Sequence, residues 1–121
     1  RALEMAWDGV DMVYMSVDID SIDCGVVPGT GWPEPGGFLP REALALASKV
    51  AAEGICGMEL VEVSPPYDTS EITALMGTRV NGDVLGSLVA SGKLGKHKAH
   101  IDKPVTIPHG EFEGKRWSNA T

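Results

Sequence analysis

Three aspartates lie close together after an apolar segment. Asp18, Asp20 and Asp23 fall within the six residues that directly follow residues 12–17. In an extended backbone Asp18 and Asp20 point to the same side, so that two carboxylates meet at one place. Like charges that close repel each other and lose hydration, so they need protons or a cation between them. Oxygen ligands suit Mn²⁺, Mg²⁺ or Ca²⁺. The cluster therefore predicts a divalent-metal site. The alternative is a solvated acidic turn whose aspartates, helped by the Ser21 hydroxyl, bond backbone amides.

The spacing of these acids argues against an EF-hand calcium loop. Such a loop would need a ligand at Ile22 and a glycine where Asp23 stands. A further acid, Glu62, follows a second apolar run. The alternative for Glu62 is a strand-end carboxylate that faces water.

The residues around the first acids predict a strand, a loop and a helix. Segment 12–18 is apolar, rich in β-forming residues and ends abruptly in acids, as a buried parallel strand can. Glycine and proline recur across 21–37, which predicts a rigid surface loop. Pro40 fits the first turn of a helix whose apolar face stops at Gly54.

The same order of elements is then repeated. Residues 55–63 form a second β-rich run. Asp68 and Glu71 resemble a capping box, and apolar residues then follow at helical spacing to about Ser91. This order predicts an α/β protein with two parallel strands covered by helices. Chemistry in such sheets lies beyond the carboxyl ends of the strands, where the aspartate cluster and Glu62 both fall.

The acidic composition limits the partners. Seventeen Asp and Glu residues against ten Lys and Arg residues give a net charge of −7, which argues against nucleic acid or an anionic membrane surface. The apolar runs are shorter than the roughly 20 residues of a membrane-spanning helix. Cys24 and Cys56 form no C-x-x-C pair, so we expect reduced thiols in a soluble, cytoplasmic protein, with a disulfide as the alternative.

The length bears on how much of an enzyme is present. A chain of 121 residues is short for an α/β enzyme with a full sheet and a complete active site. It begins at Arg1 without a charged-then-apolar leader, so we expect a fragment of a longer polypeptide. We expect residues 1–95 to form the folded part and residues 96–121 to be an irregular C-terminal extension.

Three blocks of sequence together carry a family resemblance. They are S-V-D-I-D-S-I-D, then P-G-T-G-W-P-E-P-G-G and, after a helix, E-L-V-E-V-S-P-P-Y-D. In this order and spacing they resemble the ureohydrolase (arginase/agmatinase) family, in its agmatinase-like form, over about residues 14–86. The resemblance implies a three-layer α/β/α fold with a parallel sheet. This chain would supply the C-terminal strand-helix-strand-helix part of that fold.

The resemblance also implies roles for individual residues. Asp18 matches the carboxylate that bridges two divalent metal ions, usually Mn²⁺, and Asp20 matches a terminal ligand of one of them. Glu62 matches the glutamate that receives the guanidinium of a small cationic substrate. Thr30 and Trp32 belong to a wall of the substrate pocket, and an aromatic ring there could contact a planar cation.

The family resemblance implies the chemistry of the intact protein as well. A hydroxide that bridges the metal ions would attack the guanidinium carbon, and the intermediate would expel an amine and leave urea. The family's other ligands, a histidine and a D-A-H-x-D block, and its proposed proton-transfer histidine precede the part matched here. We therefore expect the chain alone to be inactive. Two departures, Cys24 for a common proline and Glu59 for a common aspartate, fall at positions that are not ligands.

Several alternatives stay open at this stage. The substrate could be agmatine, guanidinobutyrate, guanidinopropionate, arginine, free guanidine or a formimino compound. The chain could also belong to a catalytically silent homologue with a structural or regulatory role. The family resemblance implies a homo-oligomer. His97, His100 and Asp102 could form a metal triplet by residue type, but the nearby lysines favour surface histidines there and at His109.

Overall fold

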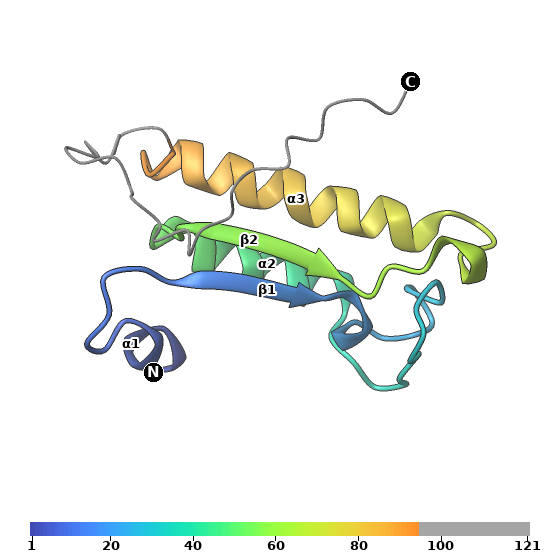
Figure 1. The fold of residues 1–121 in the computed structure, drawn as a ribbon. Coiled ribbons are helices and arrows are strands. Elements are labelled where there is room, and N and C mark those ends of the chain that lie inside the picture. The colour runs from blue at the N-terminus through green and yellow to red at the C-terminus, as the bar shows by residue number, and fades with distance from the viewer. Residues whose placement is uncertain (95–121) are drawn as a thin grey trace, which may run out of the picture.

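A computed structural model describes residues 1–94 of the chain. Figure 1 shows two strands side by side with two long helices packed along them and a short helix near the N-terminus. The histidine-containing segment and the predicted extension 96–121 lie outside the described residues. The elements, in order, are α1 (Ala2–Ala6), β1 (Tyr14–Asp18), the 3₁₀ turn η1 (Ile19–Ser21), α2 (Pro40–Ala52), β2 (Gly57–Val61), the 3₁₀ turn η2 (Pro65–Tyr67) and α3 (Ile72–Ala90).

The two strands form a parallel pair, as predicted. Their register runs from Tyr14 opposite Gly57 to Asp18 opposite Val61, so both strands end at the same level. Each strand is shorter than its predicted span, because ladder pairing is confined to these five residues. The carboxyl ends of β1 and β2 therefore meet at one edge of the sheet, on the right in Figure 1.

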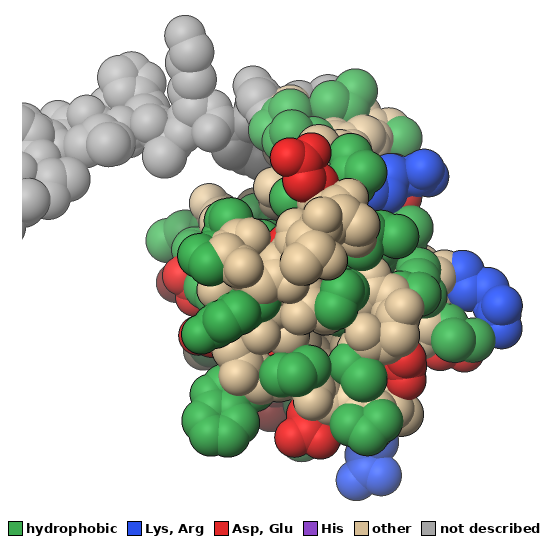
Figure 2. All heavy atoms as spheres, turned by 90° about the vertical axis from the view of Figure 1, so that its right-hand side faces the viewer, with side chains coloured by type: hydrophobic (Ala, Val, Ile, Leu, Met, Phe, Trp, Pro, Cys, Tyr) green, Lys and Arg blue, Asp and Glu red, His purple; other side chains and the backbone are tan. Residues whose placement is uncertain are grey.

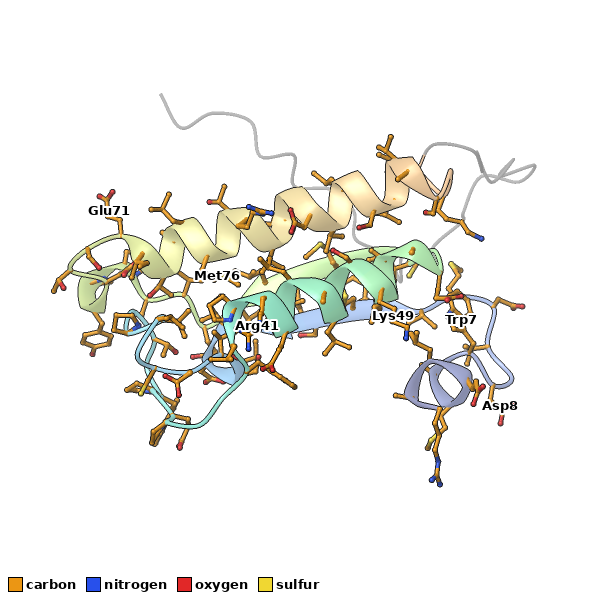
Figure 3. The ribbon with its side chains drawn as sticks, turned by 180° about the vertical axis from the view of Figure 1, so that it is seen from behind. Trp7, Asp8, Arg41, Lys49, Glu71 and Met76 are labelled. Carbon is orange, nitrogen blue, oxygen red and sulfur yellow. The ribbon has the colours of Figure 1, made fainter. Side chains whose placement is uncertain are left out.

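Helices α2 and α3 share one core with one face of the sheet. Met15 and Val17 of β1 point into this core, whereas the alternating residues Tyr14 and Ser16 are exposed. This alternation is the period of two that a half-covered strand shows. In Figure 3 Met76 lies between α3 and the strands. The α/β class is thus confirmed, and the described residues supply a parallel sheet with one layer of helices. The buried members of this core are Met15, Ala47, Ala51, Val80, Val84 and Leu88.

Helix α2 begins and ends where its sequence signals predict. Pro40 occupies the first helical position, and the Glu42 carboxylate accepts a hydrogen bond of 2.9 Å from the Leu39 amide. This bond provides a partner for an amide that has none within the helix. Gly54, with φ of 94°, lets the chain turn away after the last helical turn.

The start of helix α3 differs from the predicted capping box. Glu71 stands at the N-cap in a left-handed conformation, with φ of 58°, and its side chain makes no capping bond. Asp68 caps the helix from further away, because its carboxylate accepts hydrogen bonds from the amides of Thr73 (3.1 Å) and Ala74 (2.9 Å). The turn η2, which contains both prolines, ends at Asp68 and brings it into this position.

The glycine-proline segment after β1 has a small core of its own, which the prediction of a surface loop missed. Ile19, Ile22 and Val27 are fully buried there. Apolar residues in a loop bury themselves when the loop folds back on the body of the protein. The loop is therefore packed against the body of the protein rather than lying wholly on its surface.

Candidate metal and substrate site

The two aspartates at the end of β1 come together through a turn. Asp18 is the last residue of the strand, and Asp20 lies in η1 rather than in an extended backbone. The Asp20 amide donates to Asp18 Oδ1 at 3.2 Å, and the Ser21 hydroxyl donates to the Asp18 carbonyl at 2.7 Å. The prediction that an extended backbone aligns the two side chains was wrong, but the carboxylates are neighbours nevertheless.

The acids around Asp20 affect the pKa of its carboxyl group. Partial burial raises the pKa of Asp20, and a hydrogen bond to Asp18 and the negative charges of Asp18, Glu62 and Glu34 raise it further. A carboxylate with three acids close enough to affect it is an uncompensated site that favours a cation or a proton. Asp18, Asp20 and Glu62 were predicted members of this group. Glu34 was not, and its only sequence signal is its place in the glycine-proline loop.

Asp23 does not join this group. Its carboxylate accepts hydrogen bonds from the amides of Gly25 (2.8 Å) and Gly36 (2.7 Å), which lowers the pKa of Asp23. These bonds close the loop between β1 and α2. The alternative interpretation is therefore correct for Asp23: its carboxylate bonds backbone amides and stabilises a turn.

Glu62 follows the last residue of β2 in a left-handed conformation, with φ of 65°. Such a conformation is uncommon for residues other than glycine and often marks functional positions. The Glu62 side chain is exposed and lies next to the loop, because a methyl group built on Gly31 would be 3.8 Å from its Oε2 atom. The structure thus brings the predicted substrate carboxylate, the aspartate pair and the loop to one edge of the sheet.

Thr30 and Trp32 occupy very different surroundings. Thr30 is only 3% exposed and pairs with Val63 in an isolated antiparallel bridge. Its hydroxyl has no hydrogen-bond partner within the described part of the chain, which is unusual for a buried polar group. Trp32 is 73% exposed. Their predicted role as pocket residues stays a prediction.

The surface at this edge is acidic and apolar rather than basic. Figure 2 looks onto the end of the molecule where both strands finish. Acidic side chains lie there among hydrophobic and uncharged ones, and basic side chains appear only at the margin. A nearby hollow of about 340 Å³ includes Asp18 and Ser21, but apolar residues line most of it, and Glu62, Thr30 and Trp32 do not. The hollow therefore touches the acidic group only through Asp18.

The aspartate pair fits part of a metal centre. Its oxygen ligands are of the kind that hard divalent ions prefer, and its mutual repulsion would be relieved by a cation. Over residues 1–94, no group of three or more His, Cys, Asp or Glu side chains is arranged to hold a metal ion. The described residues thus offer two candidate ligands, and a complete metal site would need others. None of the helices of residues 1–94 is long and apolar enough to cross a membrane.

The candidate site thus combines a parallel α/β sheet with a pair of carboxylates at its carboxyl edge. The model of the arginase family matches residues 1–86, which is more than half of the chain. The chain belongs to the arginase family. This confirms the resemblance drawn from the three sequence blocks.

Individual relatives agree with this assignment. The chain is 47% identical over 73 residues to proclavaminate amidinohydrolase from Streptomyces clavuligerus, covering 60% of this chain and 23% of that protein. It is also 47% identical over 73 residues to agmatinase from Proteus mirabilis, covering 60% and 24%. The chain therefore spans less than a quarter of the length of these curated relatives.

Among solved structures, formimidoylglutamase from Bacillus subtilis resembles the chain with a TM-score of 0.70 and 29% identity. That match covers 73% of this chain and 28% of the other. The structure of the Streptomyces clavuligerus enzyme matches with a TM-score of 0.63 and 40% identity, covering 69% and 28%. These similarities confirm the arginase-like fold.

Proposed function

We propose that this chain forms part of a longer hydrolase subunit that cleaves a C–N bond in a guanidino compound and releases urea. One observation carries the proposal: in an arginase-family chain, Asp18, Asp20 and Glu62 gather at the carboxyl edge of the parallel strands. Several relatives are named for related activities, including agmatinase, guanidinobutyrase and guanidino acid hydrolase.

Asp18 and Asp20 would hold two divalent metal ions, of which Mn²⁺ is our first choice, together with ligands from outside this chain. Such cations lower the pKa of bound water and so supply a nucleophile near neutral pH. The role of the two aspartates is to hold the cations at the strand edge, and their neighbouring carboxylates give them the negative charge to do so.

Glu62 would receive the guanidinium group. Its exposed carboxylate stands beside the loop at Gly31, so a planar cation could lie between them. A carboxylate can accept two parallel hydrogen bonds from a guanidinium, which fixes the orientation of the group. The exposed Trp32 ring could contact the same substrate, whereas the Thr30 hydroxyl is buried and has no partner among residues 1–94.

In the reaction, the oxygen of water forms a bond to the guanidinium carbon, and the bond from that carbon to the substituted nitrogen breaks. A proton passes to the departing nitrogen, so that the products are urea and an amine. Glu62 stabilises the positive charge and holds the carbon in place for the attack, which is a positioning role. A formimino substrate would release formamide by the same exchange of bonds.

A catalytically silent homologue is the second candidate, because residues 1–94 contain only part of a ligand set. The intact polypeptide distinguishes the two: a histidine and a D-A-H-x-D block upstream would favour the hydrolase. Urea release should then be measured on that polypeptide with agmatine, guanidinobutyrate, guanidinopropionate, arginine and guanidine, alongside its metal content. We expect turnover of at least one compound and about two Mn²⁺ ions bound per subunit.

Two variants test the roles of the residues. Asp18→Ala should abolish both metal binding and turnover, and retained turnover would refute the assignment. Glu62→Gln should raise KM strongly while the metal content stays unchanged, whereas equal loss of both would make Glu62 a structural residue. Glu59→Gln is the matched control, since Glu59 is an exposed acid of β2, and it should leave both quantities unchanged.

A further inference from the structure

Glu62 needs support to keep its left-handed backbone. For a residue other than glycine this conformation is unfavourable, so the surrounding structure must impose it. On one side, Val61 is paired with Asp18 in the parallel ladder. On the other side, Val63 is paired with Thr30 in the antiparallel bridge. Glu62 lies between these two pairings, so both of its neighbours are held by partners from other segments.

The second pairing depends on the neighbour of Thr30. The Gly29 carbonyl accepts a hydrogen bond of 2.8 Å from the Ser64 amide, which extends the contact with the segment after Glu62. The Gly29 amide donates a hydrogen bond of 2.8 Å to the Thr73 hydroxyl. Thr73 is fully buried at the start of α3. Gly29 is thus bonded both to helix α3 and to the strand end that carries Glu62.

Asp68 completes this arrangement. Its carboxylate holds the amides of Thr73 and Ala74, so it fixes the first turn of α3 in place. Gly29 packs so closely against Asp68 that an added methyl group would come within 2.3 Å of the Asp68 Cβ atom. Only a residue without a side chain fits at this distance. Hydrogen bonds and close packing therefore act on the same short segment.

We propose that Thr73 and Asp68 are positioning residues that act through Gly29 and Thr30 to hold Glu62 in its left-handed conformation, with its carboxylate presented to the substrate. Neither residue touches the substrate. The consequence for turnover rests on the proposed function, while the structural link from Thr73 to the segment after Glu62 does not. The sequence places these residues 11 or fewer positions after Glu62, but only the fold shows that Thr73 bonds to Gly29, 44 positions earlier, and that Asp68 packs against the same glycine.

The experiment compares three variants of the intact polypeptide. Thr73→Val keeps the shape of the side chain but removes the oxygen that accepts the Gly29 amide, and Thr73→Ser keeps that oxygen. Thr78→Val is the matched control, because Thr78 is an exposed residue of the same helix whose hydroxyl donates only to the Ala74 carbonyl. The measurements are amide hydrogen exchange at Gly29 and Ser64, KM and kcat with the best guanidino substrate, and bound metal.

For Thr73→Val we expect faster exchange at both amides and a KM raised about tenfold, the equivalent of one buried hydrogen bond left unmade. Metal content and kcat should stay within about twofold of the wild type, since the aspartate pair is held by β1 and η1. Thr73→Ser and Thr78→Val should match the wild type in every measurement. This pattern would distinguish positioning from a general loss of folding.

Three results would overturn the inference. Unchanged exchange at Ser64 in Thr73→Val would show that the contact does not constrain the segment after Glu62. Metal loss in parallel with the rise in KM would indicate a general structural role. If Thr73→Val does not fold, a raised KM in Thr73→Ser would contradict the role of the hydroxyl. A wild type without guanidino hydrolysis would refute the proposed function instead, and the exchange comparison would still decide the structural link.

Discussion

Replacing Glu62 with glycine should stabilise the protein and destroy substrate binding at the same time. An L-residue in the left-handed region costs roughly 1–2 kcal/mol, and glycine adopts it freely. Glycine also loses more backbone entropy on folding, which reduces this gain in the free energy of unfolding by about 0.5–1 kcal/mol. The exposed Glu62 side chain contributes little packing, so the free energy of unfolding should rise by up to about 1.5 kcal/mol. Activity should nevertheless fall steeply, because the proposed guanidinium-binding carboxylate is gone.

Glu71→Gly provides a matched comparison. Glu71 is also exposed and left-handed, with φ of 58°, but stands at the N-cap of α3. In Figure 3 its side chain points away from the body of the protein. Glu71→Gly should give a similar gain in stability and keep full activity. Thermal unfolding and steady-state kinetics of both variants of the intact polypeptide provide the test. If Glu62→Gly is less stable than the wild type while Glu71→Gly is more stable, Glu62 makes structural contacts and the reasoning fails.

Two further predictions concern the support beneath the site. Gly29→Ala should lower the free energy of unfolding by about 1–3 kcal/mol or more, because the added methyl group overlaps Asp68. Gly82→Ala in α3 is the control: nothing lies within 4 Å of its added methyl group, so it should raise the free energy of unfolding by roughly 0.5–1 kcal/mol. Urea unfolding of both variants measures the two changes, and equal effects would contradict the close packing at Gly29. The second prediction concerns pH. Burial, the largest effect, raises the pKa of Asp68, but hydrogen bonds from Ala74 and Thr73 outweigh it, so the net pKa lies below its ordinary value. A pKa that is lowered in the folded state stabilises the protein at pH values above the pKa of the unfolded carboxyl group, about 3.9. This stabilisation is lost as the pH falls through the pKa that Asp68 has in the folded protein. Asp68→Asn should therefore be less stable than the wild type at pH 7, and the difference should shrink below about pH 4; a constant difference between pH 7 and pH 3 would show that ionisation of Asp68 does not matter.

Much of the local structure followed from the sequence. The apolar runs before Asp18 and Glu62, the Gly54 stop and the proline at the start of α2 are short-range signals, and each marks an element that the structure contains. Parallel pairing followed from the order of these elements, because strands joined through a helix run in the same direction. From the order alone, the acids after both strands could be assigned to one edge of the sheet.

Only the tertiary structure decided how that edge is built. Asp18 and Asp20 meet through a turn, Asp23 braces the loop instead of joining them, and Glu34 adds its charge from the loop. The Asp18–Asp20 contact is local, but Asp23 bonds Gly36 13 positions away and Gly29 bonds Thr73 44 positions away, and no local pattern encodes such distant partners. Composition and spacing therefore determined which residues could do chemistry. Packing of the loop against α3 and the second strand decided where their carboxylates lie, because a hydrogen bond or a close contact exists only once the chain has folded.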